Sequence, residues 1–154
     1  MKSAADNYTI STDKSLLQRS KIHRFLSEKA YWSLGIPKEF VNKAIDKSLC
    51  FGLYEESSGD QIGFARIVTD ETTFAWLCDV YVEEDFRGQG LSKKMMEAIV
   101  SHPDLQGLRR FCLTTKDGHS LYQKFGFQVT KTPDFFMEIK DNDIYKRLIN
   151  SVIN

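Results

Sequence analysis

Two glycines separated by one residue, with an arginine before them and a helix-like pattern after them, could bind an anion. The stretch comprises Arg87, Gly88, Gln89, Gly90, Leu91 and Ser92. Glycine lets the backbone approach a ligand closely, and the first N–H groups of a helix have no partner inside the helix. Together with the positive end of the helix dipole, these N–H groups suit a phosphate group.

Four interpretations of the glycine pair compete. A Walker loop requires a Lys-Ser or Lys-Thr pair after its last glycine, and this stretch has none. The dinucleotide pattern G-x-G-x-x-G would need a third glycine where Lys93 stands. A turn in which the glycines only relieve backbone strain remains open. A cradle for the pyrophosphate of coenzyme A is the fourth interpretation, and it uses the same N–H groups.

The elements around the glycine pair favour a ligand-binding position. Residues 74–82, "FAWLCDVYV", are predicted to form a buried strand, and residues 50–56 and 61–69 a hairpin around the turn "SSGD". From Leu91 the apolar residues return at helical spacing. The glycines therefore lie where a strand turns into a helix, a place at which open α/β sheets bind ligands.

The flanking segments complete a mixed fold. Before the hairpin we predict a short strand at "NYTIS", a helix within residues 12–32 capped by Thr12 or Asp13, a loop at "AYWSLGI", and a second helix after Pro37. After the central helix we predict a strand at "RRFCLTT", a short helix capped by Asp117, strands at "FQVT" and "FFMEI", and a terminal helix. The fold class is α/β, with a mixed, mostly antiparallel central sheet flanked by helices.

Composition limits the protein class. With 154 residues, 42% hydrophobic and 27% charged, we expect one soluble domain over residues 1–154. The 21 basic and 21 acidic residues cancel, which argues against nucleic-acid binding. Charges throughout the first thirty residues argue against a signal or membrane segment, so we expect a cytoplasmic protein. The spacing of the histidines and cysteines predicts that there is no metal site. Cys50, Cys78 and Cys112 are predicted to be buried free thiols.

Two motifs resemble the GNAT superfamily of N-acetyltransferases. Its acyl-CoA loop follows the pattern [RQ]-x-x-G-x-[GA] between a strand and a helix, and residues 87–92 match it except that Ser92 replaces glycine or alanine. The stretch "SLYQKFGF" is similar to the family's fourth-helix motif, with Leu121, Tyr122, Gly126 and Phe127 at the matching positions. The predicted order of elements also resembles the family's order across nearly the whole chain.

The resemblance implies an acetyl-CoA-dependent N-acetyltransferase, in which a primary amine attacks the thioester directly in a ternary complex. Acetyl-CoA is then a cosubstrate, without a metal, and the acceptor is a small-molecule or peptide amine; a homodimer is left open. Backbone amides of Val80, Tyr81 and Val82 would face the thioester carbonyl. Thr115 stands where many members carry an asparagine that contacts the pantetheine arm. Tyr122 matches the tyrosine that protonates the leaving thiolate.

The general base is not settled by the resemblance. Family bases often lie on the strand before the loop, at positions that here read Trp76 and Cys78, and neither is a credible base. Asp79 and His119 are the remaining candidates, and a water chain to a more distant carboxylate is the alternative.

Tyr31 and Trp32 would line the acceptor pocket, with ordinary core aromatics as the competing interpretation. Two rival functions also stay open: a non-catalytic acyl-CoA-binding or regulatory module of the same fold, and a small interaction domain without a ligand.

Overall fold

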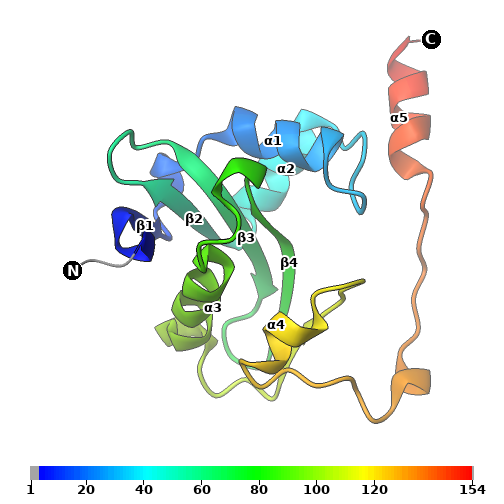
Figure 1. The fold of residues 1–154 in the computed structure, drawn as a ribbon. Helices are drawn as coiled ribbons and strands as arrows, with labels where there is room; N and C mark the ends of the chain where they lie inside the picture. Colours follow the sequence, from blue (N-terminus) through cyan, green and yellow to red (C-terminus); the bar gives the residue numbers. More distant parts are fainter. Residues whose placement is uncertain (1–3, 154) are drawn as a thin grey trace.

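A five-stranded sheet forms the centre of the molecule (Figure 1). The computed structural model describes residues 4–153. The strands follow one another in the sheet in chain order: β1 (Tyr8–Ser11), β2 (Leu49–Glu55), β3 (Gln61–Thr69), β4 (Phe74–Val82) and β5 (Arg110–Leu113). The pairs from β1 to β4 are antiparallel, whereas β5 runs parallel to β4. The predicted hairpin, meander and crossover are therefore confirmed.

Helices cover both faces of the sheet. The helices are α1 (Arg19–Glu28), α2 (Lys38–Asp46), α3 (Leu91–Ser101), α4 (His119–Gln123) and α5 (Ile144–Ile153). On one face α3 buries Leu91, Met95, Met96 and Ile99 against the strands. On the other, α1 and α2 bury a second cluster that includes Ile22, Phe25, Val41 and Ile45. In the described part of the chain, no helix is both long and apolar enough to cross a bilayer.

The first predicted helix is shorter than expected, because the helical conformation is interrupted between Leu16 and Arg19. Asp13 accepts a hydrogen bond from the Ser15 N–H (2.9 Å), so it caps a short 3-10 helix at Lys14–Leu16 and not α1. Gln18 then exchanges two hydrogen bonds with Gln61, each side-chain oxygen accepting from the other residue's backbone N–H (2.8 and 3.1 Å). These bonds hold the chain against β3 before α1 begins at Arg19.

Two other expectations at smaller scale are wrong. Asp117 does not cap α4: Gly118 is the N-cap residue, and a glycine has no side chain that could accept a hydrogen bond. Of the three cysteines, all free, Cys50 is buried as expected, but Cys78 and Cys112 are partly exposed. Burial raises the pKa of the Cys50 thiol to about 11 and that of Cys78 to about 12.

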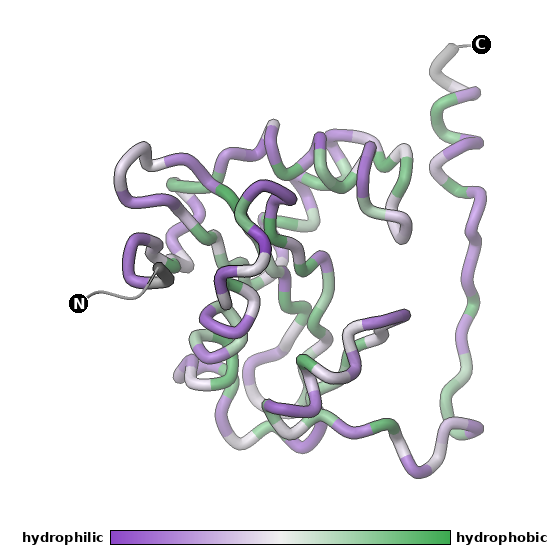
Figure 2. Tube along the Cα trace, viewed as in Figure 1, coloured by the Kyte–Doolittle hydropathy of each residue, from purple (hydrophilic) through white to green (hydrophobic). Residues whose placement is uncertain are grey.

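The two strands predicted after α4 are absent from the described chain. Residues 127–132 run beside β5 without strand pairing, and a 3-10 helix at Pro133–Phe135 precedes an extended arm that leads to α5. Figure 2 shows apolar segments along this arm, away from the body of the molecule. Both segments have the composition of a strand, but a strand also needs a hydrogen-bonded neighbouring strand. Neither segment pairs with one in the described chain.

Candidate active site

The glycine pair forms an open turn at the start of α3. Gly88 and Gly90 have φ of 81° and 77°, the left-handed region in which glycine is favoured. A side-chain carbon added at either glycine would meet nothing within 4 Å, so the outer side of the turn is free for a ligand. A hollow of about 160 Å³ lies there, lined by Val82, Phe86, Arg87, Gly88, Gly90, Leu91 and Ser92.

Hydrogen bonds fix this turn and leave the amides at the start of α3 to a ligand, although the Arg87 N–H donates to the Glu84 carbonyl (3.2 Å). Arg87 donates from Nε to the carbonyl oxygen of Val82 (2.9 Å), which ties the turn to the end of β4. Gly90 is the N-cap of α3, and the first intrahelical bond runs from the Lys94 N–H to the Gly90 carbonyl (3.0 Å). The N–H groups of residues 91–93 therefore precede the helical ladder. Gln89 differs from its neighbours: its side chain accepts from the Tyr8 hydroxyl (3.3 Å) and does not line the hollow.

The sheet opens beside this turn. The pairing of β4 with β5 ends at Leu77 and Leu113, although β4 continues to Val82. Val80, Tyr81 and Val82 therefore lie on a length of β4 that has no strand partner on the β5 side within the described chain. A β-bulge also interrupts the β3–β4 register here, and Asp79 has a positive φ of 54°. Backbone N–H groups on the open side can serve a ligand.

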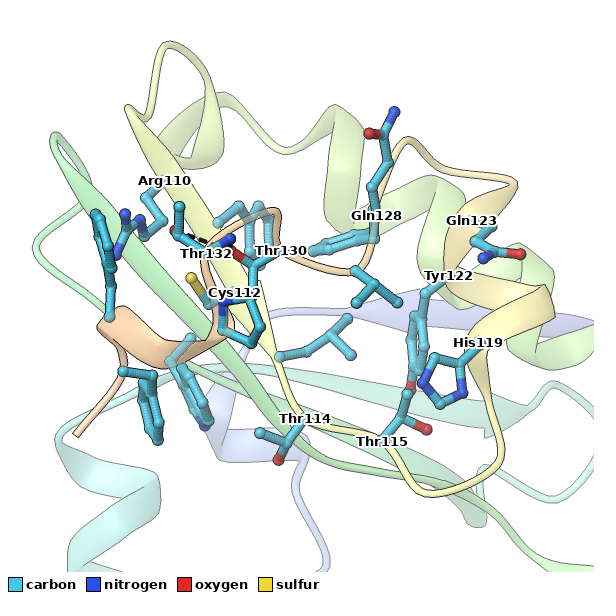
Figure 3. Close-up of a pocket in the computed structure, with 18 of the residues that line it drawn as sticks. Arg110, Cys112, Thr114, Thr115, His119, Tyr122, Gln123, Gln128, Thr130 and Thr132 are labelled. Carbon is cyan, nitrogen blue, oxygen red and sulfur yellow. Dashed lines mark hydrogen bonds between the residues drawn. The ribbon is translucent and has the colours of Figure 1, made fainter. Parts of the chain in front are cut away.

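Tyr122, His119 and Thr115 meet at the end of β5. They line one end of a cavity of about 890 Å³, where Figure 3 shows their side chains gathered near the start of α4. The Thr115 hydroxyl accepts from the Gly118 N–H (2.8 Å) and so holds this turn. A side-chain carbon at Gly118 would lie 3.0 Å from the Tyr122 ring, so the glycine makes room for the phenol. Burial, followed by the nearby Asp117 and Tyr31, raises the pKa of Tyr122, which keeps its proton at neutral pH.

Asp79 is held from two sides. One carboxylate oxygen accepts from Trp32 Nε1 (2.8 Å), and the other forms an ion pair with Arg66 Nε (2.8 Å). Arg66 also donates to the Ser48 hydroxyl (3.1 Å). Burial is the largest influence on the pKa of Arg66 and would lower it, but Asp79 together with the nearby Cys78 and Cys50 raises the pKa overall. With both oxygens engaged, the carboxylate has a fixed orientation, and this geometry suits a positioning residue better than a freely available base.

The loop between α1 and α2 lies over the same region. Tyr31 and Trp32 are 58% and 44% exposed, so they are not the core aromatics of the competing interpretation. Their rings contact each other edge to face, with centroids 5.1 Å apart. Lys116, in the segment between β5 and α4, lies with Nζ 5.5 Å from the centre of the Tyr31 ring. These contacts bring the loop, the bulge on β4 and the Tyr122 end of the cavity together.

Arg66 and Lys116 were not among the residues singled out from the sequence. The signal for Arg66 was available: a lone arginine inside the apolar strand "QIGFARIVT" must find a partner when buried, and Asp79 is the matching charge in the next strand. Lys116 gave no such signal, because an exposed lysine in a loop is ordinary.

Known proteins resemble this chain in sequence. The acetyltransferase (GNAT) domain family matches residues 46–129. A provisionally assigned acetyltransferase of Gibberella zeae is 33% identical over 138 residues, which cover 77% of each chain. The spermine/spermidine N(1)-acetyltransferase of Bacillus subtilis is 33% identical over 96 residues, 54% of this chain and 62% of the relative.

Solved structures resemble it in fold. A provisionally assigned GNAT-family acetyltransferase from Xanthomonas campestris pv. campestris superposes with a TM-score of 0.86 and 47% identity, covering 90% of this chain and 96% of the other. A provisionally assigned acetyltransferase from Clostridium acetobutylicum, solved with acetyl-CoA, has a TM-score of 0.58 and 22% identity, covering 87% of this chain and 95% of the other. The extent of these matches shows that the chain is an acyltransferase and belongs to the GNAT acetyltransferase family.

Proposed function

We propose that the protein transfers the acetyl group of acetyl-CoA to a primary amine by direct attack in a ternary complex. The observation that carries this proposal is the open turn at residues 87–92, where two left-handed glycines face free space directly before the first amides of α3. The neighbouring structure from Clostridium acetobutylicum was solved with acetyl-CoA, which supports the same cosubstrate here.

The turn would bind the pyrophosphate of the cosubstrate. Each hydrogen bond from an amide to a charged oxygen contributes roughly 1.5 to 3 kcal/mol, and the helix dipole adds up to about 2 kcal/mol. Two or three such bonds suffice to anchor the cosubstrate, while the acetyl group is presented as a thioester that an amine can attack. The open side of β4 at residues 80–82 supplies N–H donors toward the thioester carbonyl.

Tyr122 would supply the proton that the departing thiolate needs. A tyrosine phenol is protonated at neutral pH, and burial raises the pKa of Tyr122 further. Tyr122 lies on α4, which follows β5 and lines the same cavity as the end of that strand. Thr115 shapes the turn before α4 and lines this cavity too. A general acid with a proton available at neutral pH accelerates such a step by about 10² to 10⁴-fold.

The amine must lose a proton before or during attack, since a lysine-like amine with a pKa of about 10.4 is mostly protonated at pH 7. We assign Asp79 a positioning role, in which it fixes Trp32 in the acceptor loop. His119, which is exposed and lines the cavity beside Tyr122, is the side-chain candidate for the base. A water chain is the alternative, and His119→Gln distinguishes the two by whether amine-dependent turnover survives.

The test is release of free coenzyme A thiol from acetyl-CoA in the presence of a panel of primary amines, with the acetylated product identified by mass. The panel includes polyamines, because the Bacillus subtilis relative acts on spermine and spermidine, together with amino acids and short peptides. Amine-dependent thiol release supports the proposal. Binding of acetyl-CoA without thiol release for any amine would favour a non-catalytic acyl-CoA-binding module.

A further inference from the structure

The C-terminal helix α5 packs on the acceptor loop, residues 29–37 between α1 and α2. Tyr145 of α5 meets Phe40 edge to face, with ring centroids 6.1 Å apart. A side-chain carbon added at Gly35, inside the loop, would lie 3.4 Å from Ile149 Cδ1 and 3.9 Å from Tyr145 Cβ. Figure 1 shows α5 beside this loop. The last helix of the chain therefore forms an outer edge of the acceptor side of the site.

Tyr145 also lies near the ion pair on the sheet. Burial raises the pKa of its phenol, and the Asp79 carboxylate raises this pKa further, while Arg66 lowers it. Such charge effects decline with distance, so the phenol is close to the Asp79–Arg66 pair. Trp32 donates to Asp79 (2.8 Å), which places its ring at the same pair. Two aromatic side chains, one from the acceptor loop and one from α5, therefore flank this ion pair.

The surface around the ion pair is apolar. In the acceptor loop Tyr31, Trp32 and Leu34 are 58%, 44% and 54% exposed. Phe40 at the start of α2 and Ile149 of α5 are each 43% exposed. Exposed apolar side chains that gather beside a candidate site mark a surface for a ligand.

The charges at this surface are balanced or positive. Arg66 neutralises Asp79, whose second oxygen already accepts from Trp32. The Lys116 ammonium lies 5.5 Å from the centre of the Tyr31 ring and adds a positive charge. A second cation on an acceptor would be repelled by Lys116 and would find Asp79 already paired.

Two further carboxylates lie elsewhere. Asp141, which precedes α5, forms an ion pair with Arg147 of that helix. Asp117 lies near Tyr122, at the end of the cavity where the amine nitrogen would react. One positive charge therefore fits the reacting end of an acceptor, whereas an uncharged body fits the surface beside Asp79.

We propose that the acceptor is a monoamine with an apolar body, and that this body packs between the rings of Trp32 and Tyr145. The assignment rests on the proposed function, to which it adds a substrate class and a residue of α5. An apolar body gains from leaving water against these rings, whereas a second ammonium group there would lose its hydration. Tyr145 thus determines specificity without contacting the thioester.

Two amines of equal length test the substrate class. Hexylamine has an uncharged body, and hexamethylenediamine carries a second ammonium group at its far end. Release of coenzyme A thiol from acetyl-CoA is measured with each amine over a range of concentrations. We expect kcat/KM to be at least about tenfold higher for hexylamine, because the second ammonium group must be desolvated. Equal values, or a preference for the diamine, would overturn the proposal.

The role of Tyr145 is tested by two substitutions. Tyr145→Ala removes one apolar wall, so kcat/KM for hexylamine should fall about tenfold, with little change for hexamethylenediamine. Tyr145→Phe keeps the ring and should keep the preference of the wild type, which separates loss of the wall from any other effect of changing this residue. Full selectivity for hexylamine in Tyr145→Ala would exclude Tyr145 from the acceptor site.

Binding measured apart from turnover distinguishes this inference from the proposed function. Hexylamine is titrated calorimetrically into the protein saturated with coenzyme A. If no amine releases thiol, the proposed function fails, while hexylamine binding that Tyr145→Ala weakens still supports the apolar surface. If thiol is released but the diamine is preferred, the proposed function stands and this inference fails. Absence of both thiol release and hexylamine binding overturns both.

Discussion

The part of the sheet from β1 to β4, here called the complete side, differs from the part formed by β5 and the residues after it, the incomplete side. From β1 to β4 every strand has a neighbour, and the side chains of Phe51, Phe64 and Leu53 are fully buried between the sheet and its helices. Beyond Leu105, in contrast, none of the residues whose burial is described is buried. The turn at residues 87–92 belongs to the complete side, while Tyr122 and His119 stand on the incomplete one.

This difference separates two tasks in the candidate active site. The complete side holds the turn that would bind the cosubstrate, fixed by Arg87 to β4 and by the start of α3. The incomplete side carries Tyr122, the proposed proton donor, on a short helix beside the cavity of about 890 Å³. Binding and chemistry should therefore respond to different substitutions.

Tyr122→Phe should give the largest effect on the incomplete side. The ring and its packing against Phe127 remain, but the proton donor is lost, so the chemical step should slow by about 100-fold. Acetyl-CoA affinity, measured by titration calorimetry, should not change. Full turnover with a poor amine acceptor, where chemistry limits the rate, would make Tyr122 a packing residue only.

The pH dependence sharpens this assignment. A group with a raised pKa holds its proton to higher pH, so a rate that needs the Tyr122 phenol should persist up to the ordinary tyrosine pKa of about 10 and fall only above it. The Tyr122→Phe variant should lack that alkaline decline. A decline of the wild-type rate that begins well below this pH, and that persists in the variant, would belong to another group.

Asp79→Asn should have a smaller effect on turnover, about tenfold, through the acceptor side. Its Michaelis constant for the amine should rise while acetyl-CoA affinity stays within about threefold, under ~1 kcal/mol. The variant also leaves Arg66 without its anion, which for a buried pair costs roughly 3 to 5 kcal/mol of unfolding free energy. Thermal unfolding measures that loss. Unchanged amine kinetics in a folded variant would remove Asp79 from the site.

Trp32→Phe should have the smallest effect. It keeps an aromatic ring in the acceptor loop but removes the N–H that donates to Asp79, so the Michaelis constant for the amine should rise about threefold, under ~1 kcal/mol. Tyr31→Phe is the matched control, because its ring stays over Lys116. If Trp32→Phe instead changes the affinity for acetyl-CoA, Trp32 belongs to the cosubstrate side of the site and not to the acceptor loop.

The sequence predicted the complete side well because its signals are local. A turn such as "SSGD" between two apolar runs, or glycines directly before a helical stripe, fixes the conformation of the residues that contain it. Hairpin, meander, crossover and the turn at residues 87–92 were all found in this way, and the family resemblance added Tyr122 and Thr115.

The incomplete side could not be predicted to the same extent. "FQVT" and "FFMEI" have strand composition, yet their conformation depends on a neighbour that the composition does not identify. The pairing of Asp79 with Arg66 and Trp32 is also non-local, since it joins β4 to β3 and to a loop 47 residues away. Asp79 in an apolar strand signalled a partner, but only the three-dimensional fold selects which one.

The central claim is that the turn at residues 87–92 holds the cosubstrate, and coenzyme A titration of Gly90→Val tests it most directly. Valine at φ 77° strains the backbone and places a side chain in the free space that the pyrophosphate would use. Gly107→Val is the matched control, with φ 70° and equally open surroundings far from the turn. We predict at least about 100-fold weaker binding for folded Gly90→Val, the loss of roughly two charge-assisted hydrogen bonds, and wild-type binding for Gly107→Val. Unchanged affinity in a folded Gly90→Val protein would contradict the account.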